Sequence, residues 1–87
     1  MKKTTNVLGY IVTTHNQREE KLLRIIIAEC ERVREWYEKS SGIDDKYYRM
    51  AKSEADSVDK NLTAFYFMDC LDKTPSVDMW DILEYLI

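Results

Sequence analysis

Residues 15–40 read HNQREEKLLRIIIAECERVREWYEKS, and this stretch decides the fold. Apolar side chains recur in it at alternating spacings of three and four residues: Leu23, Ile26, Cys30, Val33 and Tyr37. That spacing places them on one face of a helix, with charged residues on the other face. Two overlapping capping boxes, Thr14 with Gln17 and Asn16 with Glu19, mark its start. The sequence therefore predicts one long amphipathic helix here.

A second helix is predicted over about residues 44–73, beginning at Asp44 or Asp45. Its apolar stripe is Tyr47, Ala51, Ala55, Val58, Leu62 and Phe65. From residue 62 to residue 71 the helix is apolar nearly all round, so another element is expected to cover it. A short C-terminal helix over about 75–86 is the expected cover, with Pro75 at its first position.

The predicted fold is therefore all-α: an antiparallel helical hairpin (about 15–40 and 44–73) followed by the short C-terminal helix, in one small domain over 1–87. The segment 5–13 has the β-branched residues of a strand but also the apolar spacing of a short helix. We favour the helix, because a lone strand in a helical protein lacks a partner edge. Residues 1–4 are expected to be flexible.

The hairpin has a predicted register in which residue i of the first helix lies near residue 86−i of the second. Cys30 then lies near Asp56, and Cys70 lies near His15. The two cysteines are separated by roughly 20 Å along the hairpin axis, too far for a disulfide. Free, buried thiols suit a reducing compartment, so a cytoplasmic location is expected.

Aromatic residues are concentrated at the turn end of this hairpin, where only two helices are expected. Two helices alone offer little cover for them, and Trp, Tyr and Met are enriched at protein interfaces. We interpret this end as a protein interface formed by Val33, Trp36, Tyr37, Tyr47, Tyr48 and Met50. The leading hypothesis is a non-enzymatic protein–protein interaction module that forms a homodimer and binds a protein partner of unknown identity.

Charge is unevenly divided along the chain. Residues 1–41 carry eight Lys/Arg and six Asp/Glu, a net of +2, and residues 42–87 carry five and ten, a net of −5. The acidic surface is formed by Asp69, Asp72, Asp78, Asp81 and Glu84. It is either an ordinary solvated face or the contact of a small acidic inhibitor, of the phage or mobile-element type, that occludes a basic nucleic-acid-binding site on a host protein. Direct nucleic-acid binding is disfavoured, because the lysine and arginine residues of the first helix alternate with glutamates, which repel phosphates.

Residues of catalysis, metal binding and membrane insertion are not recognisable in the sequence. His15 is the only histidine, and Cys70 lies in an apolar stretch where a thiol stays protonated. The usual cysteine and histidine spacings of metal sites are missing, and so are glycine-rich phosphate loops. No run approaches the ~20 apolar residues of a membrane span. The sequence therefore predicts no enzyme, metal site, cofactor or membrane association.

Overall fold

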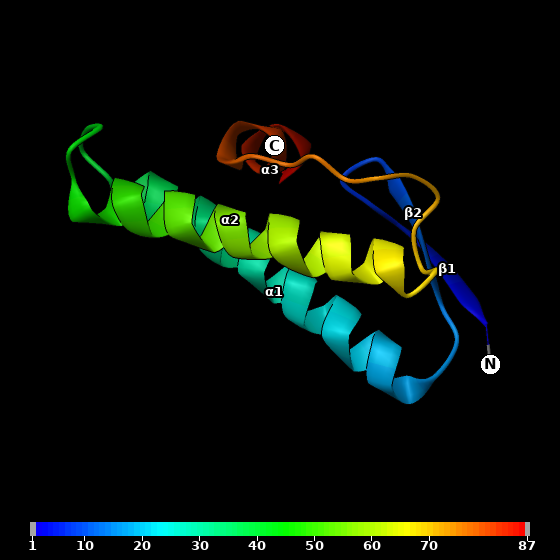
Figure 1. Ribbon diagram of the computed structural model, residues 1–87. Helices are drawn as coiled ribbons and strands as arrows, with labels where there is room; N and C mark the ends of the chain where they lie inside the picture. The colour runs from blue at the N-terminus through cyan, green and yellow to red at the C-terminus, as the bar shows by residue number, and fades with distance from the viewer. Residues whose placement is uncertain (1, 87) are drawn as a thin grey trace.

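The computed structural model describes residues 2–86, except for the side chain of residue 86. Five elements follow one another: strands β1 (Lys3–Val7) and β2 (Tyr10–Thr14), and helices α1 (Gln17–Lys39), α2 (Lys46–Phe67) and α3 (Met79–Leu86). Helices α1 and α2 form a long antiparallel hairpin, with α3 on one side of it and the two strands at its open end (Figure 1). The molecule measures 43 × 21 × 20 Å.

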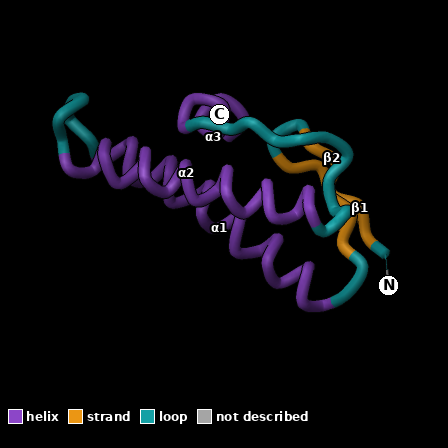
Figure 2. The backbone as a smooth tube through the Cα atoms, in the orientation of Figure 1, coloured by secondary structure: helices purple, strands orange, loops and turns teal. Residues whose placement is uncertain are grey.

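The N-terminal segment corrects the all-α prediction, because it forms an antiparallel β-hairpin (Figure 2). Its loop is Leu8-Gly9, and both residues have positive φ, 53° and 82°. Two positive φ values in a two-residue loop are typical of a type I′ turn, whose twist suits paired strands. The strand starts at Lys3, inside the segment 1–4 that was expected to be flexible, while residue 1 lies outside the described residues.

The outer edge of the β-hairpin, on β2, contacts the chain that follows α2. Val12 forms an isolated bridge with Leu71, and the Thr13 amide donates to the Cys70 carbonyl at 2.7 Å. The Ile11 amide donates to the Asp72 carboxylate at 3.2 Å. The expectation that a strand here would lack a partner was therefore wrong: β1 and β2 pair with each other, and residues 70–72 add further contacts along β2.

Helix α1 begins as the second capping box predicts. Asn16 Oδ1 accepts a hydrogen bond from the Glu19 amide at 2.9 Å, and Glu19 Oε1 accepts one from the His15 amide at 2.8 Å. Helix α2 has Asp45 as its N-cap, whose carboxylate accepts from the Tyr47 amide at 2.7 Å. Both caps satisfy amides that have no partner within the helix.

The predicted register of the helical hairpin is confirmed. Arg32 Nη2 lies 2.7 Å from Glu54 Oε1, and the Ser57 hydroxyl donates to Glu29 at 2.5 Å, each pair matching i and 86−i. The predicted stripe of α2 is buried from Ala51 to Phe65, against Leu23, Ile26, Cys30 and Val33 of α1. Both cysteines are free and buried, as the register implies.

The end of α2 differs from the prediction, since the helix stops at Phe67 and does not continue to about residue 73. Asp69 has φ 59°, its amide donates to the Tyr66 carbonyl, and the Cys70 amide donates to the Phe65 carbonyl. These two bonds define a Schellman motif with Asp69 in the left-handed position that glycine usually takes. The chain then reverses toward β2.

The C-terminal helix also starts later than predicted. Asp78 and Asp81 form a reciprocal cap, in which each carboxylate accepts a hydrogen bond from the other residue's amide, so α3 begins at Met79 and Pro75 lies outside it. Helix α3 packs against both α1 and α2 through Met79, Ile82 and Leu83. It leaves part of α2 uncovered, because Phe67 is 80% exposed. The expectation of cover around all of residues 62–71 was wrong.

No helix among the described residues has the length and apolar content needed to cross a membrane.

Candidate functional site

The turn end of the helical hairpin holds two pairs of stacked or tilted rings, one from each helix. Trp36 and Tyr47 stack with ring centroids 5.8 Å apart and planes 14° apart. Tyr37 and Tyr48 lie 6.4 Å apart at 50°. Such pairs add stability beyond the area that they bury. Four of the six predicted interface residues are therefore brought together.

The other two predicted interface residues behave differently. Val33 is fully buried in the core, so its side chain offers no surface for a partner. Met50 is exposed, one turn into α2.

Lysine side chains lie over the outer faces of the first ring pair. Lys39 Nζ lies 5.3 Å from the Trp36 centroid, and Lys46 Nζ lies 5.2 Å from the Tyr47 centroid. Both are cation–π contacts.

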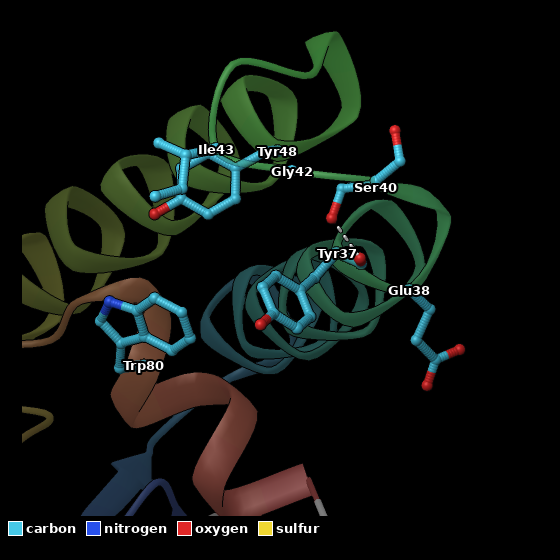
Figure 3. Close-up of a pocket in the computed structure, with 8 residues that line it drawn as sticks. Tyr37, Glu38, Ser40, Gly42, Ile43, Tyr48 and Trp80 are labelled. Atoms are coloured by element: carbon cyan, nitrogen blue, oxygen red, sulfur yellow. Dashed lines mark hydrogen bonds between the residues drawn. The ribbon is translucent and has the colours of Figure 1, made fainter.

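Trp80 of α3 adds a third ring to Tyr37 and Tyr48, although it was not predicted from the sequence to lie at the turn end. Its ring meets that of Tyr37 edge-on, with centroids 5.6 Å apart and planes 78° apart. Between the three rings lies a pocket of about 520 Å³ (Figure 3). The pocket is lined by Tyr37, Glu38, Ser40, Ser41, Gly42, Ile43, Tyr48 and Trp80. The position of Trp80 could not be predicted from the sequence, because it depends on the path of residues 68–78 between α2 and α3.

We call this set the aromatic bend: Trp36, Tyr37, Tyr47, Tyr48 and Trp80, with the pocket between Tyr37, Tyr48 and Trp80. Ile43 lies at the rim of the pocket, in the loop between the helices, and is 76% exposed. Glu38 at the same rim pairs with Arg34 Nε at 3.0 Å. The aromatic bend thus combines a hollow with a protruding apolar side chain.

The predicted acidic surface is divided between several structural positions. The Asp72 carboxylate accepts a hydrogen bond from the Ile11 amide, and Asp78 and Asp81 cap α3. Asp69 occupies the turn after α2, and Glu84 is exposed on α3. Local hydrogen bonds therefore account for three of these five acids, Asp72, Asp78 and Asp81.

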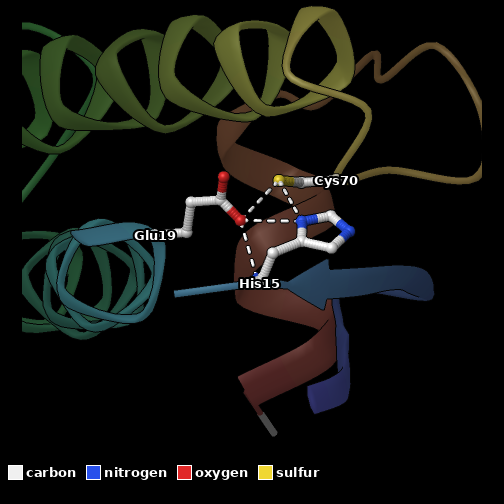
Figure 4. Close-up of side chains that lie close together, drawn as sticks. All are labelled: His15, Glu19 and Cys70. Carbon is white, nitrogen blue, oxygen red and sulfur yellow. Dashed lines mark hydrogen bonds and ion pairs between the residues drawn. The ribbon is translucent and has the colours of Figure 1, made fainter. Parts of the chain in front are cut away.

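A second group of side chains meets at the open end of the hairpin, where His15, Glu19 and Cys70 converge (Figure 4). Glu19 Oε1 lies 2.9 Å from His15 Nδ1 and 3.4 Å from Cys70 Sγ, and Sγ lies 4.0 Å from Nδ1. Cys70 is 1% exposed, whereas the imidazole is half exposed. The register predicted that Cys70 lies near His15, and this is confirmed. Glu19 was recognised only as a capping residue.

The electrostatics of this second group follow from burial and hydrogen bonding. Burial, together with the hydrogen bond to Glu19 and its charge, raises the pKa of the Cys70 thiol to about 11. The hydrogen bond from the His15 amide, and then that from its ring, lower the pKa of Glu19. The thiol is therefore protonated at neutral pH and donates to a carboxylate.

In comparisons with known proteins, no family model matches the chain, and neither a curated protein nor a solved structure shows significant similarity to it.

Proposed function

We propose that this chain is a non-enzymatic protein–protein interaction module that associates with a second copy of itself through the aromatic bend. The observation that carries the proposal is the position of Ile43, 76% exposed, at the rim of the pocket between Tyr37, Tyr48 and Trp80. A protruding side chain and a hollow of suitable chemistry lie on one patch.

A two-fold interface requires a self-complementary patch, because the same patch of both copies meets itself, and a protruding side chain beside a hollow meets this requirement. Ile43 of one copy enters the pocket of the other, and the reverse contact follows by symmetry. The pocket volume, about 520 Å³, lies within the range of about 300–1,000 Å³ that is usual for binding pockets. Its aromatic walls are of the residue types that contribute most to binding at protein interfaces.

The charge around the pocket permits this self-contact. Residues 38–46, which supply most of the pocket lining, contain three acids and two bases, so this segment has a net charge of only −1. One of these acids, Glu38, is paired with Arg34. Two near-neutral patches do not repel each other strongly, in contrast to the acidic C-terminal half.

The same surface is where a protein partner of different sequence would bind, in competition with the second copy. A cytoplasmic location remains part of the proposal and is supported by two free thiols. The alternative of an acidic inhibitor has no comparable support, since three of the five acids accept hydrogen bonds from backbone amides, in the cap of α3 and in the contact with β2.

Sedimentation equilibrium over a wide concentration range tests the proposal. The wild-type chain is expected to form a dimer, and Ile43→Lys is expected to raise the dissociation constant at least ~10-fold, equivalent to ~1.4 kcal/mol, because it places a charge in an apolar pocket. Ile25→Lys is the matched control: Ile25 is also an exposed isoleucine, but it lies in the middle of α1 and does not line the pocket.

Two outcomes would contradict self-association through the aromatic bend. One is a wild-type chain that stays monomeric at high micromolar concentration. The other is an Ile43→Lys variant that dimerises as tightly as wild type while keeping its helical circular dichroism.

A further inference from the structure

The three side chains at the open end come from three separate segments. His15 lies between β2 and α1, Glu19 is in the first turn of α1, and Cys70 follows the turn after α2. Two backbone bonds fix Cys70: its carbonyl accepts from the Thr13 amide at 2.7 Å, and its amide donates to Phe65 at 2.9 Å. Backbone contacts therefore fix the position of Cys70 relative to β2 and to the end of α2.

The order of contacts is not that of a nucleophilic triad. In a triad the acid contacts one imidazole nitrogen and the nucleophile contacts the other. Here Glu19 and Cys70 both face His15 Nδ1, while the other ring nitrogen points away from them (Figure 4). Three atoms that can each bind a metal ion converge on one point.

The distances between these atoms fit a metal centre. Tetrahedral zinc with one sulfur and two nitrogen or oxygen ligands places the ligand atoms about 3.3–3.6 Å from one another. The observed separations are 4.0, 3.4 and 2.9 Å, so a movement of about half an ångström at exposed His15 is sufficient. Nitrogen, sulfur and oxygen together are a ligand set typical of Zn²⁺.

We propose that His15 Nδ1, Glu19 and Cys70 Sγ bind one divalent transition-metal ion of the zinc class, with water in the fourth position. Binding forms a metal–sulfur bond, and the thiol proton is released to solvent. A neutral imidazole binds through Nδ1 and carries its proton on Nε2. The ion replaces the hydrogen bonds that now join the three side chains.

Such an ion would act as a structural cross-link. It would join the end of the β-hairpin, the start of α1 and the chain after α2. Domains below about 80 residues commonly use a metal or disulfides in this way, and a chain of 87 residues is close to that limit. Its cysteines form no disulfide, so the metal is the cross-link that the described residues offer.

Titration of the untagged protein with Co²⁺ tests the site directly. The wild-type chain is expected to bind one Co²⁺ with a thiolate-to-cobalt charge-transfer band in the near ultraviolet, and Zn²⁺ is expected to displace it. Cys70→Ala is expected to lose the band, whereas the matched control Cys30→Ala keeps it, because Cys30 is buried elsewhere in the core. His15→Ala is expected to weaken binding at least ~100-fold, since even an outer-shell partner contributes 10–100-fold.

Thermal unfolding gives a second readout. Zn²⁺ is expected to raise the Tm of wild type and of Cys30→Ala but not that of His15→Ala, whose side chain is half exposed, so that the variant still folds. If Cys70→Ala fails to fold, His15→Ala decides the question. A wild-type cobalt spectrum identical to that of Co²⁺ in buffer, or a band that depends on Cys30 and not on Cys70, would overturn the proposal.

Discussion

Glu29 lies buried between the two long helices, and its Oε1 accepts a hydrogen bond of 2.7 Å from Asn61 Nδ2 across the interface. Ser57 donates to the other carboxyl oxygen at 2.5 Å. Buried polar groups are tolerated when they are hydrogen-bonded in this way. Helix α1 therefore has a polar contact inside its apolar face, and this contact helps to fix the register.

Glu29→Ala is expected to destabilise the fold by about 2–3 kcal/mol, because it leaves Ser57 and Asn61 without their shared partner. Chemical denaturation monitored by circular dichroism measures the change. The control is Glu35→Ala, at an exposed position on the same helix, where the expected change is within about 0.5 kcal/mol. Equal losses in the two variants would show that the buried contact contributes nothing specific.

The starts of α1 and α2 could be predicted from the sequence because their causes are local, whereas the start of α3 was predicted too early. Asn16 with Glu19, and Asp45 alone, provide the capping chemistry within a few residues of each start. The spacing of Ala51, Ala55 and the following stripe sets the buried face of α2. Glu29 was missed because a charged residue within an apolar face has no partner until the second helix is placed against it.

The elements that could not be predicted depend on unusual residues at turns. Type I′ hairpins normally have Asn or Asp before glycine, but here Leu8 takes that position. Helix α2 ends with Asp69 where glycine is usual. Without a glycine to mark the end, the sequence predicted that the helix continues to about residue 73. Trp80 reaches the aromatic bend only because that turn redirects the chain, and the sequence does not encode this path locally.

Gly9→Ala is expected to destabilise the protein by about 1–2 kcal/mol, because Gly9 has φ 82° and alanine is strained there. A Cβ at this position would also lie 2.5 Å from the Tyr85 hydroxyl, but Tyr85 is exposed and can move aside. The backbone strain at Gly9, and not the contact with Tyr85, therefore accounts for most of the expected loss of stability. Gly42→Ala is the matched control: its Cβ would meet nothing within 4 Å, and we expect unchanged stability or a gain of up to about 1 kcal/mol. A loss in Gly42→Ala as large as that in Gly9→Ala would count against this explanation.

Asp69→Gly is expected to stabilise the protein by about 0.5–1 kcal/mol, because glycine takes the left-handed position of the Schellman motif without strain. The gain is smaller than the full strain, since glycine also makes the unfolded chain more flexible. Ala64→Gly, inside α2, is the control and is expected to cost about 1 kcal/mol. Differential scanning calorimetry distinguishes the two by the sign of the change in Tm, and a lower Tm for Asp69→Gly would give Asp69 a stabilising role of its own.

The two thiols give a prediction about pH that also probes the group at the open end. Burial raises the pKa of both Cys30 and Cys70 from 9.0 to about 11. A raised thiol pKa contributes stability that is fully present below about pH 9 and is lost as the pH rises through about 11. At pH 8 the fraction of thiolate is about 100-fold lower than in the unfolded chain, so alkylation by iodoacetamide is expected to be slower by at least that factor.

Glu19→Gln separates the two cysteines. The hydrogen bond and charge of Glu19 contribute to the raised pKa of Cys70, while the charge of Glu29 is the corresponding contributor at Cys30. Removing the negative charge of Glu19 should therefore lower the pKa of Cys70 and speed its alkylation, with Cys30 as an internal control in the same molecule. Peptide mass spectrometry after timed alkylation measures both rates. If both cysteines speed up together, local opening of the fold and not the Glu19 contact controls the reactivity of Cys70.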